Sequence, residues 1–193
     1  MQKIYWDSVE YNNTPFFFTI TDKGLNFVGS PDKPLSEFFD FYPNAKFTSE
    51  FLNDSDKTDE YVDQFKDYFE GKSKRFDLPI DYDYVGGTDF QREVWQELTN
   101  IPYGKTKTYS EIADEISKPK ASRAVGHAVA LNPLLIVIPC HRVVREDGSL
   151  GGYRGGEKQK KALLSLESTA PVRKSLIKKL PLPKLSELGR PDL

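Results

Sequence analysis

The sequence predicts a protein of two folded parts, a small α/β domain over residues 1–80 and a mostly α-helical domain over residues 88–167. Two observations lead to this division. Before residue 80, short aromatic and β-branched runs alternate with helical patterns, whereas after residue 88 the apolar residues recur mainly at helical spacing. Residues 81–87 are predicted to form a linker, and residues 168–193 a basic tail that contains four prolines.

The first domain is expected to combine strands and helices. Residues 3–10, 16–20 and 25–28 are predicted strands, separated by turns at Asn-Asn-Thr-Pro and Asp-Lys-Gly. Residues 36–42 and 59–69 are predicted helices, and the second of them ends before Gly71, a residue type that favours helix termination. Residues 76–80 are predicted to form a further short strand. We assign the aromatic residues of this part to its core.

The second domain is expected to contain four helices. Thr88 and Asp89 can cap a helix over 90–98, which ends at Ile-Pro-Tyr-Gly. Helices over 110–116 and 121–130 are separated by a short turn, a spacing typical of a helix-turn-helix. Residues 134–138 form an apolar run that we expect to be buried and extended. A final helix is predicted over 157–166, and the tail shows a short helical pattern at 174–180.

The charge is unevenly distributed along the chain. Residues 1–85 carry a net charge of −8 (9 Lys and Arg against 17 Asp and Glu), residues 86–167 carry +2 (12 against 10), and residues 168–193 carry +4 (6 against 2). The acidic first part disfavours contact with nucleic acid, whereas the mildly basic second part permits it. The single cysteine and the lack of an apolar run of about 20 residues favour a cytoplasmic protein without membrane contact, with nuclear access if the cell is eukaryotic. One cysteine and two histidines disfavour a metal centre, and no cofactor is predicted.

Cys140 is the only cysteine, and it lies in the motif Ile-Pro-Cys-His-Arg-Val. A lone cysteine is either a small buried apolar side chain or a nucleophile. The apolar run before it favours the first interpretation. His141, Arg142 and Arg145 favour the second, because an imidazole or a positive charge promotes the reactive thiolate. Pro139 keeps the preceding residue extended, so a sulfur can be presented at the end of a buried segment.

The segment 121–130 is unusually rich in small side chains, and Arg123 is its one long charged residue. Two interpretations stay open for it. It is either a packed helix with a solvated arginine, or a recognition helix that approaches DNA closely and carries Arg123 to the base stack.

Several motifs follow one another between residues 86 and 167. They are Gly-Thr-Asp-Phe-Gln-Arg-Glu-Val-Trp (87–95), Ile-Pro-Tyr-Gly-Lys-Thr-Lys-Thr-Tyr (101–109), Ser-Arg-Ala-Val-Gly (122–126), Asn-Pro (132–133), Ile-Pro-Cys-His-Arg-Val-Val (138–144), Gly-Tyr-Arg-Gly-Gly (152–156) and Lys-Lys-Ala-Leu-Leu (160–164), followed by Glu167. Together they closely resemble the C-terminal domain of the O6-alkylguanine-DNA alkyltransferases. The resemblance implies a ribonuclease-H-like N-terminal α/β domain and a mostly α C-terminal domain with a winged-helix-like helix-turn-helix.

The resemblance also implies a function. The protein would repair double-stranded DNA by moving an alkyl group, such as methyl, from O6-alkylguanine to Cys140, and would act less well on O4-alkylthymine. The transfer would be direct, irreversible and stoichiometric, because nothing in the chain suggests a way to cleave the resulting thioether. The protein would act as a monomer, with cooperative binding along DNA left open.

The resemblance assigns roles to residues around the cysteine. Cys140 would be the alkyl acceptor, His141 would take its proton through a water, and Glu167 would orient His141, as expected of an activated thiol. Asn132 would fix the turn that places the cysteine. Tyr109 would lie near the flipped base and its 3′ phosphate, and would help to protonate the departing guanine.

Further residues are implied in contact with DNA or with the extruded base. Arg123 would fill the gap in the base stack, since the target lies inside a duplex and must be extruded. Ala121, Ser122 and Gly126 would contact DNA from the same helix. The backbone at Cys140 and Val143 would read the guanine edge. The pocket would be closed by Tyr153 and by the Arg154-Gly155 backbone.

Two residues depart from the family pattern. Arg154 stands where members often have a small residue, and Glu157 where they often have an apolar one. We expect Arg154 either to narrow the pocket or to contact a phosphate. The zinc site of some relatives cannot form, for want of cysteines.

Two other functions compete with repair. The first is a non-catalytic binder of damaged DNA, like the alkyltransferase-like proteins, but those lack the cysteine and commonly carry tryptophan in its place. The second is a cysteine hydrolase or redox enzyme, which would lack a second cysteine for resolution and would leave the DNA-binding motifs unexplained.

Overall fold

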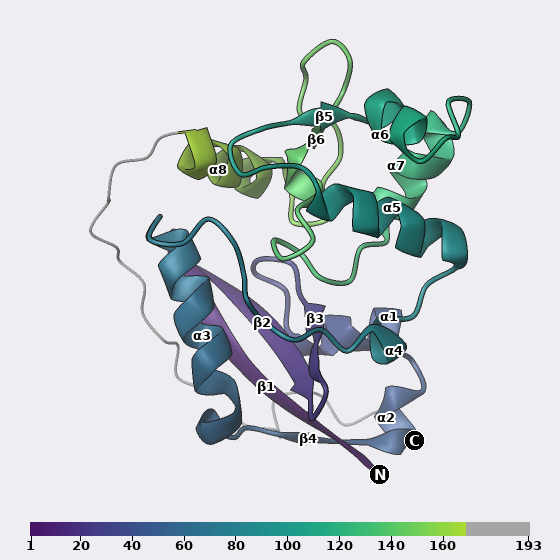
Figure 1. The fold of residues 1–193 in the computed structure, drawn as a ribbon. Coiled ribbons are helices and arrows are strands. Elements are labelled where there is room, and N and C mark those ends of the chain that lie inside the picture. The colour runs from purple at the N-terminus through teal and green to yellow at the C-terminus, as the bar shows by residue number, and fades with distance from the viewer. Residues whose placement is uncertain (169–193) are drawn as a thin grey trace.

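A four-stranded sheet forms the centre of the N-terminal half, and a group of helices forms the C-terminal half (Figure 1). The computed structural model describes residues 1–168. The predicted helix at 174–180 and nearly all of the predicted tail lie outside the described residues, although Ser168, which we placed in the tail, is the last residue of a helix. Among the described residues, no helix is long and apolar enough to cross a membrane.

The sheet has the order β3-β2-β1-β4, and β4 is parallel to β1 whereas the other neighbours are antiparallel. Its strands are β1 (Gln2–Tyr11), β2 (Thr14–Thr21), β3 (Gly24–Val28) and β4 (Ser49–Leu52). The first three confirm the predicted strands. Asn12 and Asn13 both have positive φ, 52° and 60°, as a tight hairpin turn requires. The sequence did not indicate β4, a four-residue edge strand that begins with polar Ser49 and Glu50.

Helix α3 (Ser55–Phe69) packs along β1 and β2 (Figure 1). It begins four residues before the predicted helix, because the Asp54 side chain accepts a hydrogen bond from the Asp56 amide and caps it. The predicted helix at 36–42 is a 3-10 turn, η1 (Leu35–Glu37), followed by α1 (Phe38–Phe41). A short helix, α2 (Ala45–Thr48), leads into β4.

The predicted strand at 76–80 is wrong. The only ladder contact there is an isolated bridge between Ile80 and Leu25, flanked by hydrogen bonds from Leu25 N to Pro79 O and from Asp81 N to Leu25 O. Pro79 has no amide hydrogen to continue a ladder, so the segment stays irregular. The predicted linker over 81–87 contains the helix α4 (Tyr82–Val85), and Asp81 is buried and accepts a hydrogen bond from Thr21 Oγ1 at 2.5 Å.

The C-terminal half confirms the four predicted helices, with ends that move by at most two residues. They are α5 (Asp89–Thr99), α6 (Tyr109–Glu115), α7 (Ser122–Ala130) and α8 (Glu157–Ser168). Capping boxes, Thr88 with Gln91 and Thr108 with Glu111, begin α5 and α6. Trp95 of α5 donates a hydrogen bond from its indole nitrogen to the Ala128 carbonyl of α7 at 2.8 Å, which fastens the two helices together.

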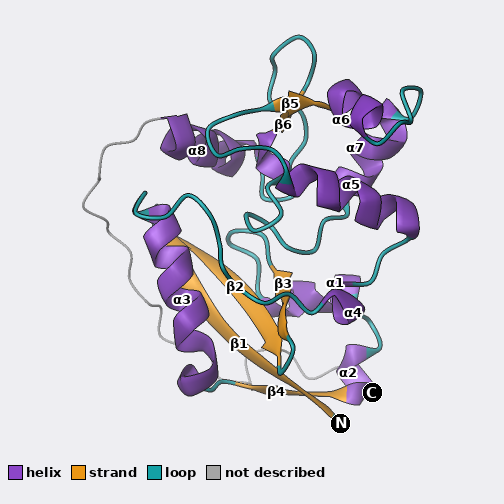
Figure 2. Ribbon diagram, viewed as in Figure 1, coloured by secondary structure: helices purple, strands orange, loops and turns teal. Residues whose placement is uncertain are grey.

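The segment that connects α7 to α8 is mostly loop (Figure 2). It contains a 3-10 turn, η2 (Cys140–Arg142), and the short strand β6 (Val143–Val144), which pairs in parallel with β5 (Lys107–Thr108). The expected extended conformation of 134–138 is wrong. The segment is largely buried but turns back, with Ile138 N donating to Leu134 O at 3.0 Å and Ile136 at φ 73°.

The two halves share a large group of buried side chains, which includes Phe65 and Tyr68 of α3 as well as Leu98 of α5 and Leu163 of α8. Val28 at the end of β3 pairs with Leu134, and its amide donates to the Pro133 carbonyl at 2.9 Å. The loop that leads to Cys140 therefore rests directly on the N-terminal sheet.

Candidate active site

Cys140 is buried, with 2% of its surface exposed, at the start of the 3-10 turn η2. Its Sγ lies 3.1 Å from Asn132 Nδ2, which donates to it. The same amide donates to the carbonyls of Ile138 (2.9 Å) and Leu134 (3.3 Å), and its Oδ1 accepts from the Leu134 amide (2.9 Å). Asn132 therefore holds both ends of the turn that precedes the cysteine as well as the sulfur itself.

His141 and Glu167 form a buried pair. His141 Nε2 lies 2.7 Å from Glu167 Oε1, and neither side chain has exposed surface. Burial alone would raise the pKa of Glu167, but hydrogen bonds from His141 and Arg142 and their charges hold it at about 2. Burial lowers the pKa of His141. At neutral pH, Glu167 is thus ionised and His141 neutral, so the single ring proton lies on Nε2 and the lone pair on Nδ1.

The free lone pair on His141 Nδ1 is buried and has no hydrogen-bond partner among the described residues. A buried acceptor without a partner is uncommon and calls for an explanation, such as a water or a catalytic role. The ring of His141 lies 6.4 Å from that of Tyr153, in an edge-to-face arrangement.

The Cys140 thiol is protonated in the resting protein. Burial raises the pKa of the thiol, an effect that the hydrogen bond from Asn132 and the charges of Arg154 and Lys160 offset only in part. The sequence had suggested that the neighbouring positive charges create a thiolate. The structure indicates instead a thiol that needs a base when it reacts.

Glu167 binds more groups than the sequence had indicated. Arg142 donates to both of its oxygens, with Nε 2.9 Å from Oε2 and Nη2 3.0 Å from Oε1. The Gly104 amide donates to Oε2 at 3.1 Å, and the Tyr68 hydroxyl donates to Oε1 at 2.5 Å. The sequence could have identified Arg142 as a site residue, because it follows His141 in the same motif. Tyr68 lies in α3, and no sequence signal links it to Glu167.

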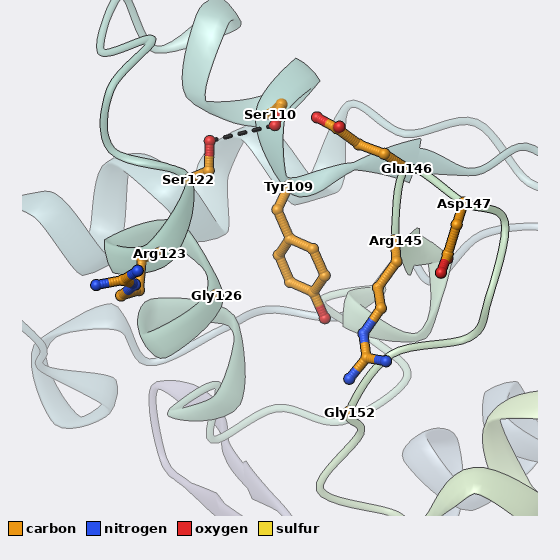
Figure 3. A pocket seen from close by; sticks show the side chains of 9 residues that line it. All are labelled: Tyr109, Ser110, Ser122, Arg123, Gly126, Arg145, Glu146, Asp147 and Gly152. Carbon is orange, nitrogen blue, oxygen red and sulfur yellow. Dashed lines mark hydrogen bonds between the residues drawn. The ribbon is translucent and has the colours of Figure 1, made fainter.

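A pocket of about 690 Å³ lies beside the two helices of the helix-turn-helix (Figure 3). Tyr109 stands between Arg123 on α7 and Arg145 on the loop after β6. The pocket is lined by Tyr109, Ser110, Ser122, Arg123, Gly126, Arg145, Glu146, Asp147 and Gly152. The structure thus brings together four residues of the predicted site, Tyr109, Ser122, Arg123 and Gly126, and adds Arg145.

The two arginines of this pocket are exposed, and no hydrogen bond or ion pair holds their side chains within residues 1–168. Burial raises the pKa of Tyr109, and the nearby Cys140 raises it further, so the phenol keeps its proton. Ala121 precedes α7 as its N-cap and does not line the pocket. Cys140 is also absent from the lining, although a charge on its sulfur raises the pKa of Tyr109.

The segment 152–156, which we expected to close the pocket, contributes only Gly152 to its lining. A Cβ on Gly155 would clash with the ring of Tyr153, so this position favours glycine. Lys160 of α8, which the sequence had not singled out, is fully buried, and its Nζ donates to the carbonyls of Val143 (2.5 Å) and Gly152 (3.3 Å). Lys160 therefore holds the two ends of the loop that carries Arg145.

Both expectations for the Arg154 side chain are wrong. Its guanidinium neither lines the pocket nor is available to a phosphate, because it is bound to the N-terminal half. Nη1 donates to Glu37 Oε1 (3.2 Å) and Ser30 Oγ (3.3 Å), and Nη2 donates to the carbonyls of Val28 (2.9 Å) and Asn132 (3.0 Å). The aromatic rings of β3 and α1 complete its surroundings.

Comparison with known proteins identifies the family of this chain. Residues 89–169 match the family model described as the DNA-binding domain of 6-O-methylguanine DNA methyltransferase. The inducible methylated-DNA–protein-cysteine methyltransferase of Bacillus subtilis is 46% identical over 86% of this chain and 92% of its own length.

Solved structures of methyltransferases are also similar to this chain. The O6-methylguanine methyltransferase of Mycobacterium tuberculosis superimposes with a TM-score of 0.70 at 36% identity, over 88% of this chain and 96% of that one. A structure of the Mycobacterium tuberculosis protein in complex with DNA gives a TM-score of 0.68 at 34% identity, over 85% and 92% of the two chains. From its near-complete match to the Bacillus protein, this chain belongs to the family of methylated-DNA–protein-cysteine methyltransferases.

Proposed function

We propose that this protein repairs DNA by transferring an alkyl group, typically methyl, from O6 of guanine to Sγ of Cys140. The observation that carries the proposal is the buried constellation of Cys140, Asn132, His141 and Glu167 in a chain of this family. A sulfur nucleophile, a neutral imidazole with a free lone pair and a carboxylate that orients it are the parts that an activated thiol needs.

The proton of the thiol goes to His141. A water placed between Sγ and the unpaired Nδ1 would carry it, and the ionised Glu167 would stabilise the imidazolium that forms. The sulfur attacks the alkyl carbon, a C–S bond forms, and the C–O6 bond breaks with its electron pair leaving on the guanine. Tyr109, whose phenol is protonated, supplies a proton to the departing base. Cys140 ends as a thioether, so each molecule acts once.

The pocket beside the helix-turn-helix would receive the DNA. An alkylated base inside a duplex must be extruded to reach a buried sulfur, and extrusion costs a few kcal/mol. The exposed, unpaired Arg123 would enter the space that the base leaves, and Ser122, Gly126 and Ala121 on the same helix would lie against the backbone. The small side chains of α7 permit this close approach.

Once extruded, the base would lie between Tyr109 and the segment after the pocket. The backbone of Cys140 and Val143 would bind the guanine edge, and Tyr153, with the backbone of Arg154 and Gly155, would cover it. The position of the Tyr153 ring, 6.4 Å from the ring of His141 beside the cysteine, supports this placement.

The proposal has wider parts. O4-alkylthymine would be a poorer substrate, the protein would act as a monomer with or without cooperativity on DNA, and the free thiol suits the cytoplasm. For the fold, the sheet order with β4 parallel to β1 supports a ribonuclease-H-like N-terminal domain over residues 1–80. The β5-β6 pair beside α6 and α7 supports a winged-helix-like domain over residues 88–167.

The test is the mass of the protein after incubation with a duplex that contains one O6-methylguanine. We expect one added methyl group per protein molecule, located on the peptide that contains Cys140, and no more at any excess of DNA. Cys140→Ala should still bind the duplex but gain no mass. Folded wild-type protein that gains no methyl would refute the proposal.

A further inference from the structure

Tyr68 is the one residue outside the C-terminal half whose side chain is hydrogen-bonded to Glu167 among the described residues. It lies in the last turns of α3 and is 1% exposed. We propose that Tyr68 is a positioning residue for alkyl transfer, which holds Glu167 against His141 and governs how readily His141 takes the thiol proton. This inference rests on the proposed function of Cys140, and it makes the N-terminal half part of the catalytic relay.

The geometry places Tyr68 and His141 on the same carboxylate oxygen. The Tyr68 hydroxyl lies 2.5 Å from Glu167 Oε1, and His141 Nε2 lies 2.7 Å from that atom. The hydroxyl is itself only 3.4 Å from His141 Nε2. The hydrogen bond from Tyr68 therefore fixes the position of the oxygen that orients the imidazole and takes part of its negative charge.

The direction of the hydrogen bond is fixed by protonation. Burial, the charge of Glu167 and the hydrogen bond to it raise the pKa of Tyr68 well above its ordinary value, so the phenol keeps its proton and donates. Glu167, ionised, can only accept. By sharing the negative charge of Oε1, Tyr68 reduces the pull of the carboxylate on a proton at His141.

Several other groups also change the pKa of His141, and the effect of Tyr68 adds to theirs. Burial and the charges of Arg142 and Lys160 lower the pKa of His141, whereas Glu167 raises it. The titratable and charged groups that face His141 and Glu167 are Tyr68 of α3, Tyr103 after α5, Cys140 and Arg142 of η2, Tyr153 of the closing loop and Lys160 of α8.

Replacing Tyr68 with phenylalanine removes the donor and keeps the ring, which packs against Phe69, Phe76 and Tyr103. The charge on Oε1 is then less shared, so His141 holds a proton up to a higher pH. Losing a hydrogen bond of ordinary strength to this buried carboxylate corresponds to an upward shift of about one pH unit in the titration midpoint of His141. The acid limb of the alkyl-transfer rate, measured in single turnover on an O6-methylguanine duplex, should move by a similar amount.

Tyr11→Phe is the matched control. Its hydroxyl also reaches α8, where it donates to the Ala162 carbonyl (3.4 Å), five residues before Glu167. It should leave the acid limb where it is. A merely structural role of Tyr68 would lower the rate at every pH without moving the limb.

A second measurement does not depend on alkyl transfer. The chain has two histidines, buried His141 and exposed His127, so their imidazole NMR signals can be followed through a pH titration. Tyr68→Phe should raise the midpoint of His141, and Tyr11→Phe should leave it unchanged. If wild-type protein takes up no methyl group, the proposed function fails, and this titration still decides whether Tyr68 acts on His141.

Three results would overturn the inference. An unchanged His141 midpoint in folded Tyr68→Phe would show that the hydroxyl does not act on the imidazole. A rate that falls equally at all pH values would assign Tyr68 a structural role. Loss of folding in Tyr68→Phe, with Tyr11→Phe folded, would show that the hydroxyl serves stability rather than the relay.

Discussion

Replacing Arg154 with alanine would cut the side-chain link between the loop after Cys140 and the N-terminal half. Four hydrogen bonds would be lost, to Ser30, Glu37, the Val28 carbonyl and the Asn132 carbonyl. Asn132 holds the turn before the cysteine, so the change should affect both stability and the placement of the sulfur.

The magnitude follows from the burial of the ion pair. The side chains of Arg154 and Glu37 are 13% and 11% exposed, so alanine at 154 leaves an almost buried carboxylate without its cation. Breaking such a pair costs about 3–5 kcal/mol. Because Glu37 keeps two hydrogen bonds from Ser30, we expect the lower end, about 3 kcal/mol.

Urea unfolding at pH 7 measures this loss. Arg154→Ala should lower the free energy of unfolding by about 3 kcal/mol, and the double variant Arg154→Ala/Glu37→Gln should recover part of it, because no charge is left unpaired. Lys23→Ala, which removes a largely exposed ion pair with Asp83, should change nothing measurable. A loss below about 1 kcal/mol in Arg154→Ala would refute the reasoning.

Three further changes test other contacts. Burial lowers the pKa of Lys160 to about 8, below its ordinary 10.5, so between these pH values the unfolded chain binds one more proton than the folded protein. The free energy of unfolding, measured relative to that of Lys160→Met, should therefore rise by up to about 3 kcal/mol from pH 8 to 10.5. A difference between the two proteins that does not change with pH would contradict this. Arg123→Ala should slow repair of a duplex by about tenfold or more but leave reaction with free O6-benzylguanine unchanged, and equal losses would argue against a role in extrusion. Gly155→Ala should cost about 1–3 kcal/mol in thermal unfolding through its clash with Tyr153, whereas Gly152→Ala, whose Cβ meets nothing within 4 Å, should be tolerated.

The sequence predicted those elements whose causes are local. The helices α5 and α6 begin at capping boxes, and the β1-β2 hairpin turns at two asparagines that tolerate positive φ. The apolar faces of α3 and α5 recur at helical spacing. Each of these features depends on residues that are close together in the chain, so pattern alone locates them.

Other features depend on partners that lie far apart in the sequence. The residues 76–80 have strand-like composition, but Pro79 breaks the ladder and only one bridge to β3 forms. The side chain of Arg154 has no local preference, and its partners on β3 and η1 lie more than a hundred positions away. The motif around Cys140 indicated its chemistry, yet only the fold shows that burial keeps the thiol protonated.

The indole of Trp95 gives the protein an optical reporter beside α7, the helix that we propose to contact DNA. The chain has two tryptophans, Trp6 in β1 and Trp95 in α5, and both are buried. Because the Trp95 indole is hydrogen-bonded to α7, any displacement of that helix alters its surroundings, whereas Trp6 lies in the opposite half. In a Trp6→Phe protein, the intrinsic fluorescence of Trp95 would therefore report a displacement of α7 without an attached dye.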